Sequence, residues 1–412
     1  MNDRIVITGM GTVNPLGLSV DESWKNAIEG KSGVGPITLF DASKLEVHIA
    51  CEVKQFNPSN YMSARDVRRR DRFEQLAIAA VKEAHHQAGL QAGFYQPERV
   101  GVYIASAIGG IQTTNDGVLA LNEHGHKKLS PLLIPMLMIN GASGMISIEY
   151  GYRGPSLTVV SACASGSDAI GMGWQMLRAG IVDMAVVGAA EATITAIGIA
   201  TFDRVGALSR HTNGYTETPK PFDLHRDGLV MGEGAAVLIL EREERAISRG
   251  AHVIAEIAGH ASSSDAYHVT APREDGSGGA QAMLQSLRAA KIDPSEVDYI
   301  NAHGTATKLN DVIETRAIKT VFGTHSYDVA ISSTKSMTGH MMGATGALET
   351  IFCALAIKNN VIPPTINYST PDPECDLDFV PNDAREQEVK VAINNAFGFG
   401  GHNAVLVIRE YL

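Results

Sequence analysis

The chain has 412 residues, of which 34 are Lys or Arg and 45 are Asp or Glu, giving a formal net charge of −11 at pH 7. This acidic balance argues against a protein that binds nucleic acid non-specifically. No apolar run approaches the roughly 20 residues that span a bilayer, and the residues after Met1 lack the pattern of a signal peptide. The four cysteines share no CxxC spacing and no zinc pattern with histidine. We therefore expect a cytoplasmic protein with reduced thiols, no membrane segment and no metal site.

Residues 4–9 (RIVITG) are predicted to form the first strand, which ends at a glycine turn. The sequence Gly9-Met10-Gly11 begins like a dinucleotide-binding fingerprint. That fingerprint then fails, because Asn14 stands at the third glycine position. Helical periodicity predicts a helix over residues 74–88, and residues 100–105 (VGVYIA) form a continuous apolar run typical of a buried strand.

The next apolar run, residues 156–160 (SLTVV), also has the character of a buried strand. It leads directly into SACASG, which places Cys163 at the start of a helix rich in Ala, Gly and Met that is predicted to end near residue 179. Further strands are predicted at residues 184–188 and 234–240.

The second half of the sequence repeats this arrangement. A predicted strand at residues 297–300 leads to His303, and another at residues 329–332 leads through Lys335 to His340 and a small-residue helix over 341–357. We align Cys163 with His340, because each follows a strand and precedes a small-residue helix. The pattern indicates an internal duplication built from buried parallel strands, with a site between the two halves.

Cys163 is a candidate nucleophile. At a strand-to-helix junction, unpaired backbone N–H groups and the helix dipole stabilise a thiolate and lower the cysteine pKa. Ala162, Ala164 and Gly166 allow a substrate carbonyl to approach the backbone closely. The alternative is a buried, inert cysteine.

Two histidines in glycine-flanked turns are further candidates, His303 in His-Gly-Thr and His340 in Thr-Gly-His. Either could instead be a hydrogen-bonded core residue. Lys335 lies close to an apolar strand end and should need a partner, for which Glu349 is the obvious candidate. A surface carboxylate is the alternative interpretation of Glu349.

The stretch NNAFGFGGH, residues 394–402, joins three glycines to two phenylalanines. Such a loop can direct backbone N–H groups at an oxyanion. A turn with only a structural role is the alternative.

Four motifs resemble those of the β-ketoacyl-[acyl carrier protein] synthases: SACASG, NAHGTAT, SSTKSMTGH and NAFGFGGHN. The resemblance covers essentially the whole chain, and SSDAYHVTAP and CDLDFVP are most similar to the type II synthases. It implies an α/β protein with the thiolase-like fold, in which duplicated βαβαβαββ halves give a five-layer αβαβα sandwich. The halves are expected to cover residues 1–250 and 251–412, and such enzymes act as homodimers.

The resemblance also implies an activity. An acyl group on Cys163 condenses with malonyl-acyl carrier protein, giving 3-oxoacyl-acyl carrier protein, CO2 and free carrier protein in fatty acid elongation. The partner is acyl carrier protein, whose phosphopantetheine arm carries the substrates, and no cofactor is implied.

Site residues carried over from the family have several roles. Cys163 matches the nucleophile, and His303 and His340 match the histidines that promote decarboxylation and stabilise the enolate. Lys335 matches a lysine that orders the site, with Glu349 as its partner. Phe399 matches a gating phenylalanine whose N–H forms an oxyanion hole with that of Cys163. The residues that match hydroxyls holding the pantetheine arm are Thr270, Thr305 and Thr307. Ile108 and Phe202 match residues that shape the acyl pocket, and Ile108 is expected close to the dimer interface.

A carrier protein is acidic and this chain is acidic too, so docking requires a local cluster of basic residues. Arginines concentrate between residues 65 and 72, and Lys127-Lys128 adds a second cluster. The family's carrier-binding cations correspond to Arg65, Arg68, Arg69, Lys127 and Lys128. The alternative is a solvated arginine-rich helix, since Asp66 and Asp71 dilute the charge.

The sequence departs from the family pattern at three positions. Lys308 replaces a common proline after the HGTxT threonine, Gly206 replaces a docking arginine, with Arg204 nearby, and His402 replaces a common threonine beside the gate loop. These departures are expected to affect the substrate entrance and loop motion rather than the catalytic set.

Three other functions remain open alternatives. A biosynthetic thiolase needs a second catalytic cysteine, which the GFGGHN loop does not offer. A type II polyketide ketosynthase needs a non-catalytic partner subunit. A chain-length partner subunit would lack the nucleophile, whereas this chain has Cys163.

Overall fold

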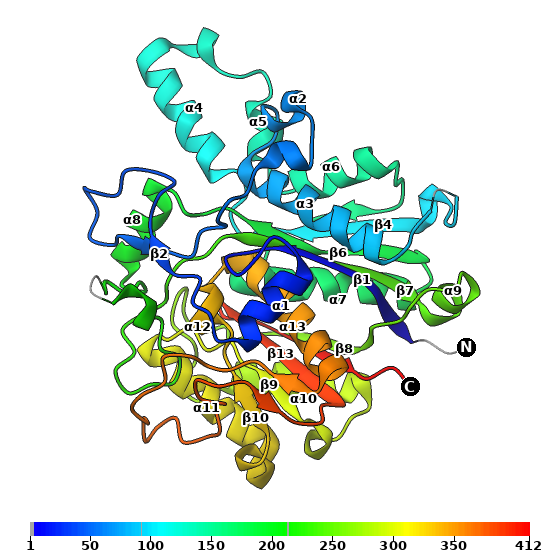
Figure 1. The fold of residues 1–412 in the computed structure, drawn as a ribbon, viewed down its shortest axis with the longest axis vertical. Helices are drawn as coiled ribbons and strands as arrows, with labels where there is room; N and C mark the ends of the chain where they lie inside the picture. Colours follow the sequence, from blue (N-terminus) through cyan, green and yellow to red (C-terminus); the bar gives the residue numbers. More distant parts are fainter. Residues whose placement is uncertain (1–3, 92, 212–213) are drawn as a thin grey trace.

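The computed structural model describes residues 4–91, 93–211 and 214–412. Ten of its strands belong to one hydrogen-bonded sheet (Figure 1). In the N-terminal half these are β1 (Ile5–Val13), β4 (Val100–Ala105), β5 (Ser156–Leu157), β6 (Met184–Glu191) and β7 (Gly234–Arg242). In the C-terminal half they are β8 (Ala255–Ser264), β9 (Tyr299–Asn301), β10 (Ala330–Ser332), β13 (Val391–Gly398) and β14 (His402–Arg409).

The two sets of five strands share one topology. The spatial order is β5-β4-β6-β7-β1 in the first half and β10-β9-β13-β14-β8 in the second. The sets are joined by a short antiparallel pairing of β1 with β8. Both sets are mixed rather than parallel as predicted, since β7 and β14 run antiparallel to their neighbours. The apolar runs arise because both faces of the sheet are covered, and this does not require parallel pairing.

Helices and sheet form five layers. On the outer faces lie α3 (Arg72–Gln87) and α6 (Gly141–Tyr150) for the first half, and α10 (Ser277–Ala290) and α11 (Lys308–Phe322) for the second. Between the two halves of the sheet lie α7 (Ser165–Arg178) and α13 (Thr345–Asn359) (Figure 1). The remaining helices and short strands are α1 (Val20–Ile28), α2 (Ala64–Val67), α4 (Ile111–His124), α5 (Leu133–Leu137), α8 (Ala196–Val205), α9 (Glu243–Ser248), α12 (Lys335–Thr338), β2 (Gly35–Pro36), β3 (Ile49–Ala50), β11 (Val361–Ile362) and β12 (Arg385–Glu386).

The central helices α7 and α13 approach each other through small residues. A Cβ added to Gly166 would lie 2.7 Å from the carbonyl oxygen of Gly343, and one added to Gly346 would lie 2.3 Å from Ser167 Oγ. Each helix follows a 3₁₀ turn, η4 (Ala162–Ala164) before α7 and η8 (Met342–Ala344) before α13. The close contact explains why both helices are rich in Ala and Gly.

The register of the duplication differs from the predicted one. Ala162 and Met342 each open a 3₁₀ turn and have positive φ angles of 52° and 45°. Cys163 therefore corresponds to Gly343, and the alignment of Cys163 with His340 is wrong by three residues. The prediction failed because a positive φ at a non-glycine residue leaves no mark in the sequence.

Strand β5 is shorter and more exposed than predicted. It covers two residues, and Leu157 and Val160 are 47% and 49% exposed. The strand lies at the end of the sheet, next to β4 alone. An apolar edge strand with this exposure is a surface that a second chain can cover.

Helices α4 and α5 project from the body of the protein (Figure 1). None of the residues of α4 is buried. Large apolar side chains are exposed on this projection: Val118, Leu119, Leu121, Ile134 and Met138. A single chain leaves this apolar surface uncovered.

Candidate active site

Cys163 lies in the turn between β5 and α7, and a network of hydrogen bonds fixes that turn. Ser161 N donates to Ser165 Oγ (2.9 Å), and the same hydroxyl donates to the carbonyl of Ala162 (2.6 Å). Ala162 has a left-handed backbone conformation that a non-glycine residue adopts only where its surroundings enforce it. The turn directs the thiol of Cys163 into a cavity.

The cavity has a volume of about 500 Å³ and brings together most of the predicted site residues. Its lining includes Cys163, His303, His340, Phe399, Phe202, Thr270, Thr305, Thr307, Gly206 and Lys308. Of the predicted residues, Lys335 and Glu349 lie behind the wall, and Ile108 is outside the lining. Residues from both halves thus meet at one cavity, as expected for a site between the halves.

His303 and His340 are buried neighbours. Their rings are 5.4 Å apart and nearly perpendicular, at 85°. His340 Nδ1 is hydrogen-bonded to Thr345 Oγ1 (3.1 Å), which leaves Nε2 for a substrate. Burial is the main cause that lowers the pKa of both histidines well below 6.5, and the charge of Lys335 adds to it. Both rings are therefore neutral at pH 7 and can donate one N–H each.

Lys335 and Glu349 form a buried ion pair behind the histidines. Lys335 Nζ donates to Glu349 Oε1 at 2.6 Å and also approaches the carbonyl of Ala302 at 3.4 Å. Burial raises the pKa of Glu349 to about 7, although the charge of Lys335 opposes this effect. Because the lysine is 1% exposed, losing either partner leaves a buried group without its counter-charge.

Two backbone N–H groups point at the thiol of Cys163, its own and that of Phe399. They lower its pKa, as does the charge of Lys335, but burial outweighs them and raises the pKa to about 11. The predicted lowering of this pKa is therefore wrong for the resting protein. Desolvation of the thiolate decides the sign, and the N–H pair is set to stabilise negative charge that develops during reaction.

Phe399 lies between the cavity and the exposed loop that follows β13. Its ring stacks on Phe202 with centroids 6.2 Å apart. Gly400 and Gly401, which follow it, both have positive φ. The preceding Gly398 lies so close to the nucleophile turn that an added Cβ would be 2.9 Å from Cys163 N. The glycine-rich segment around Phe399 thus rests on the turn that holds Cys163.

Comparison with known proteins agrees with this geometry. The family model "Beta-ketoacyl synthase, N-terminal domain" matches residues 2–246, and "Beta-ketoacyl synthase, C-terminal domain" matches residues 254–369. The chain belongs to the β-ketoacyl synthase family. Its fold is the thiolase-like, five-layer fold that the resemblance implied.

Relatives of this β-ketoacyl synthase share its full length. It is 45% identical over 411 residues to "3-oxoacyl-[acyl-carrier-protein] synthase 2" of Staphylococcus aureus (strain COL), covering 100% of this chain and 99% of the relative. It is 43% identical over 408 residues to the protein of the same name from Synechocystis, covering 99% and 98%.

Solved structures of ketosynthases are similar over whole chains. "The ishigamide ketosynthase/chain length factor" superposes with a TM-score of 0.94 at 36% identity, with 100% of both chains covered. A type II polyketide acyl carrier protein in complex with its ketosynthase gives a TM-score of 0.93 at 35% identity, again over 100% of both chains.

Two buried glutamates of this β-ketoacyl synthase were missed by the sequence analysis. Glu314 accepts hydrogen bonds from the backbone N–H groups of His303 and Gly304, each at 2.8 Å. Glu191 accepts from Ala107 N (2.7 Å) and Gly343 N (3.1 Å). The partners of Glu191 are remote in sequence, and only its place at the end of the apolar strand β6 could have indicated it. Glu314 is closer to its partners, which lie ten and eleven residues before it, but its helix carries other charged residues and gives no such signal.

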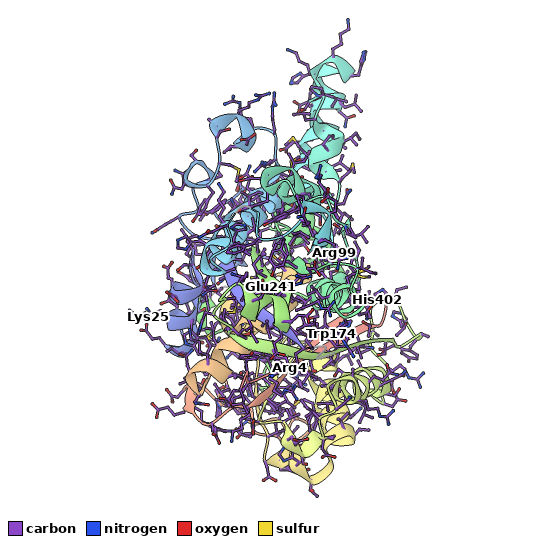
Figure 2. The ribbon with its side chains drawn as sticks, turned by 90° about the vertical axis from the view of Figure 1, so that its right-hand side faces the viewer. Arg4, Lys25, Arg99, Trp174, Glu241 and His402 are labelled. Carbon is purple, nitrogen blue, oxygen red and sulfur yellow. The ribbon has the colours of Figure 1, made fainter. Side chains whose placement is uncertain are left out.

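The departures from the family pattern lie around the cavity. Gly206 ends α8 with φ 76°, a conformation in which an arginine would be strained. Lys308 is the exposed first residue of α11 and lines the cavity. His402 is exposed at the start of β14 and does not line the cavity (Figure 2).

The predicted docking cations are all exposed. Arg65, Arg68 and Arg69 lie on or next to α2, and Lys127 and Lys128 lie in a 3₁₀ turn after α4. Arg70 and Arg72, which belong to the same arginine-rich stretch, instead pair with Glu149 (3.2 Å) and Glu233 (2.5 Å). These two arginines are structural residues.

Neither a metal cluster nor a membrane span is found in the described part of the chain. Among residues 4–91, 93–211 and 214–412, no group of three or more His, Cys, Asp or Glu side chains is placed to hold a metal ion. Within the same residues, no helix combines the length and hydropathy needed to cross a bilayer.

Proposed function

We propose that this chain elongates acyl groups in fatty acid synthesis. It condenses acyl-acyl carrier protein with malonyl-acyl carrier protein to give 3-oxoacyl-acyl carrier protein, CO2 and free carrier protein. The observation that carries the proposal is one cavity in which Cys163 faces two backbone N–H groups and two neutral histidines. Full-length relatives named 3-oxoacyl-acyl carrier protein synthase 2 support it.

In the first step Cys163 takes the acyl group. Its sulfur attacks the thioester carbonyl, whose oxygen becomes negative and is stabilised by the N–H groups of Cys163 and Phe399. The carbon–sulfur bond to the pantetheine arm breaks, and the thiol proton leaves with the carrier thiolate. The acyl group keeps its activation because one thioester replaces another.

In the second step malonyl-acyl carrier protein loses CO2. The electron pair of the breaking carbon–carbon bond moves onto the malonyl thioester, where His303 and His340 donate N–H groups to the enolate oxygen. The enolate carbon then attacks the acyl-Cys163 carbonyl, and the Cys163 thiolate leaves. The Cys163 thiolate takes up one proton from solvent to restore the thiol, and the proposed chemistry has no cofactor. The charge of Lys335, which is paired with Glu349, adds to the burial that keeps both histidines neutral.

The histidine pKa values make this step insensitive to mild acid. Because both pKa values lie well below 6.5, the N–H donors are unchanged as the pH falls from about 7.5 to about 6.5. We expect no histidine titration in the rate of malonyl decarboxylation across that range, and any change there would follow the Glu349 carboxyl, whose pKa burial raises to about 7. Below about 6.5 the unfolded histidines bind protons that the folded protein does not, so stability falls with the pH. Decarboxylation rates and urea midpoints measured against pH check this, and an apparent pKa near 6.5 in the rate would contradict it.

The carrier's pantetheine arm is proposed to enter through the mouth of the cavity. Thr270, Thr305 and Thr307 line it, and the last two hydroxyls are hydrogen-bonded to each other at 3.0 Å. Phe202 lines the same cavity as Cys163 and is proposed to shape the acyl pocket with Ile108. Ile108 is held beside the site through its N–H to Glu191 (3.3 Å).

Ile108→Phe is expected to shorten the acyl chain that the protein accepts. The larger ring fills space that a long chain needs, so condensation with long acyl carrier protein substrates falls while short ones are retained. Product lengths measured by mass spectrometry check this. Ile181→Phe, at a surface position 47% exposed, is the control, and unchanged long-chain activity in Ile108→Phe would refute the assignment.

A homodimer is proposed to cover the apolar edge. Strand β5 exposes Leu157, and Ile148 on the adjacent α6 is 77% exposed. The α4–α5 projection adds further exposed apolar surface. We also propose that residues 1–250 and 251–412 form the two halves of each protomer, since this boundary falls between α9 and β8. We further propose that the protein is cytoplasmic.

The exposed cations are proposed to dock acyl carrier protein. Reversing Arg68 and Lys128 together to Glu is expected to raise the KM for acyl carrier protein about tenfold at low salt, with kcat within about twofold. The exposed Lys358, at the end of α13, supplies the control variant Lys358→Glu. A KM that does not move in the double reversal would place docking elsewhere.

The experiment that tests the function uses the purified chain alone. Its mass in solution is measured, and it is mixed with acyl and malonyl forms of acyl carrier protein and followed by mass spectrometry. An acyl adduct on Cys163, then 3-oxoacyl-acyl carrier protein and CO2 from a homodimer, supports the proposal. Activity only with a second, different subunit would favour a type II polyketide ketosynthase, the function that the structural similarity to polyketide ketosynthases makes the second candidate.

A further inference from the structure

Asp168, in the first turn of α7, is a carboxylate that the proposed mechanism does not use. Its Oδ2 accepts a hydrogen bond from Ser161 Oγ at 2.5 Å, and its Oδ1 accepts from Ser262 Oγ and from His260 Nε2 (3.1 Å). The side chains of Asp168 and His260 are 13% and 5% exposed. Asp168 thus connects Ser161, just before the nucleophile turn, to strand β8 of the other half.

His260 is part of the contact between α7 and β8. Its ring lies over Gly171, where an added Cβ would be 2.3 Å from ring atoms. Three residues further along α7, Trp174 Nε1 donates to the carbonyl of Ile257 on β8 at 2.9 Å (Figure 2). Asp168, Gly171 and Trp174 recur at intervals of three, so they share one face of the helix. The contacts along this face hold α7 against β8.

The imidazole of His260 is oriented by Asp168. Within the described residues, Nδ1 of His260 is buried without a hydrogen-bond partner. Nε2 is the ring nitrogen that faces the carboxylate, so it carries a proton and donates to Asp168.

Ser161, whose hydroxyl donates to Asp168, directly precedes the strained residue of the turn. Ala162 follows with φ 52°. A Cβ added to Gly398 would lie 2.9 Å from both Ser161 O and Cys163 N, so the gate loop rests on this turn. A displacement of Ser161 therefore changes how the N–H groups of Cys163 and Phe399 converge on the reacting carbonyl oxygen.

We propose that Asp168 is a positioning residue for the nucleophile turn, acting through its bonds to Ser161 and His260. It does not line the substrate cavity, so its effect is on geometry and not on substrate contact. The inference rests on the proposed function and adds a residue to it. Acylation of Cys163 depends on this geometry, whereas malonyl decarboxylation depends on the histidines, which come from other elements.

The test measures two rates in the full-length protein: acylation of Cys163 by acyl-acyl carrier protein in a single turnover, and decarboxylation of malonyl-acyl carrier protein. Asp168→Ala is expected to slow acylation about 10- to 100-fold, as small misplacements of reacting groups do, with KM and decarboxylation within about twofold. Asp168→Asn keeps one acceptor oxygen for Ser161 but turns amide N–H groups toward Ser262 and His260, so acylation is expected to recover only in part, to a rate between those of Asp168→Ala and wild type.

A double-mutant cycle sharpens the test. Ser161→Ala removes the same hydrogen bond from its other end, so it should slow acylation as Asp168→Ala does, and the double variant should be no slower. Ser286→Ala, which removes a buried hydroxyl bond to the carbonyl of Met283 in α10 (2.8 Å), is the matched control and should acylate normally.

Three results would overturn the inference. Equal acylation rates in the wild type and Asp168→Ala would overturn it alone. Parallel loss of acylation and decarboxylation would show a general structural role instead of positioning. If the wild-type protein forms no Cys163 adduct, the proposed function fails and this inference with it.

Discussion

A Cys163→Gln variant is expected to lose condensation by more than about 10⁴-fold, the scale seen when a nucleophile is removed, while malonyl decarboxylation continues. The amide cannot accept an acyl group, so no carbon–carbon bond forms. His303 and His340 come from different elements and keep their places in the cavity. Condensation is measured as 3-oxoacyl product, and decarboxylation as CO2 released from malonyl-acyl carrier protein.

Cys375 supplies the control for this prediction. Cys375 is 1% exposed and does not line the cavity, so Cys375→Ala should retain both activities in folded protein. Loss of decarboxylation together with condensation in a folded Cys163→Gln variant would mean that the thiol and the histidines do not have separate roles.

Replacing His303 or His340 by Ala is expected to give the opposite result. Each change removes one neutral N–H donor to the enolate oxygen, and losing one such donor costs about 10²- to 10³-fold in rate. Decarboxylation and condensation fall together by this factor. Acylation of Cys163 proceeds, because the N–H groups of Cys163 and Phe399 that serve it are backbone groups. Single-turnover acylation and CO2 release measure the two effects separately.

His325 provides the matched histidine control. Its Nε2 is hydrogen-bonded to the carbonyl of Val297 at 3.0 Å, and it does not line the cavity. His325→Ala is expected to retain decarboxylation. If His303→Ala and His340→Ala slowed acylation as much as decarboxylation, the histidines would have to act in the first step as well.

The elements around the site could be predicted because their signals are local. Residues 100–105 form β4 as expected, since a fully apolar run between turns has few other structures available. The small-residue motif around Cys163 predicted the start of α7 to within a few residues. The family resemblance rested on motifs at turns, where the residue type is tied to one backbone conformation.

What could not be predicted depends on distant parts of the chain. The exposure of Leu157 follows from the place of β5 at the end of the sheet, which an apolar run does not reveal. The ion pair of Arg72 could not be predicted, because its partner Glu233 is remote in sequence. The pKa of Cys163 depends on burial that only the assembled layers produce.

The corrected register has a consequence for how chemistry is assigned to the two halves. Gly343 is the counterpart of Cys163, and its N–H donates to the carboxylate of Glu191, which burial raises to a pKa of about 7. The duplicated fold thus forms two equivalent turns, each with a backbone N–H group placed to donate to a negatively charged oxygen. At Gly343 that oxygen belongs to the protein's own Glu191. At Cys163 we propose that it belongs to the thioester of the substrate, so equivalent positions in the two halves of the repeat have different chemical roles.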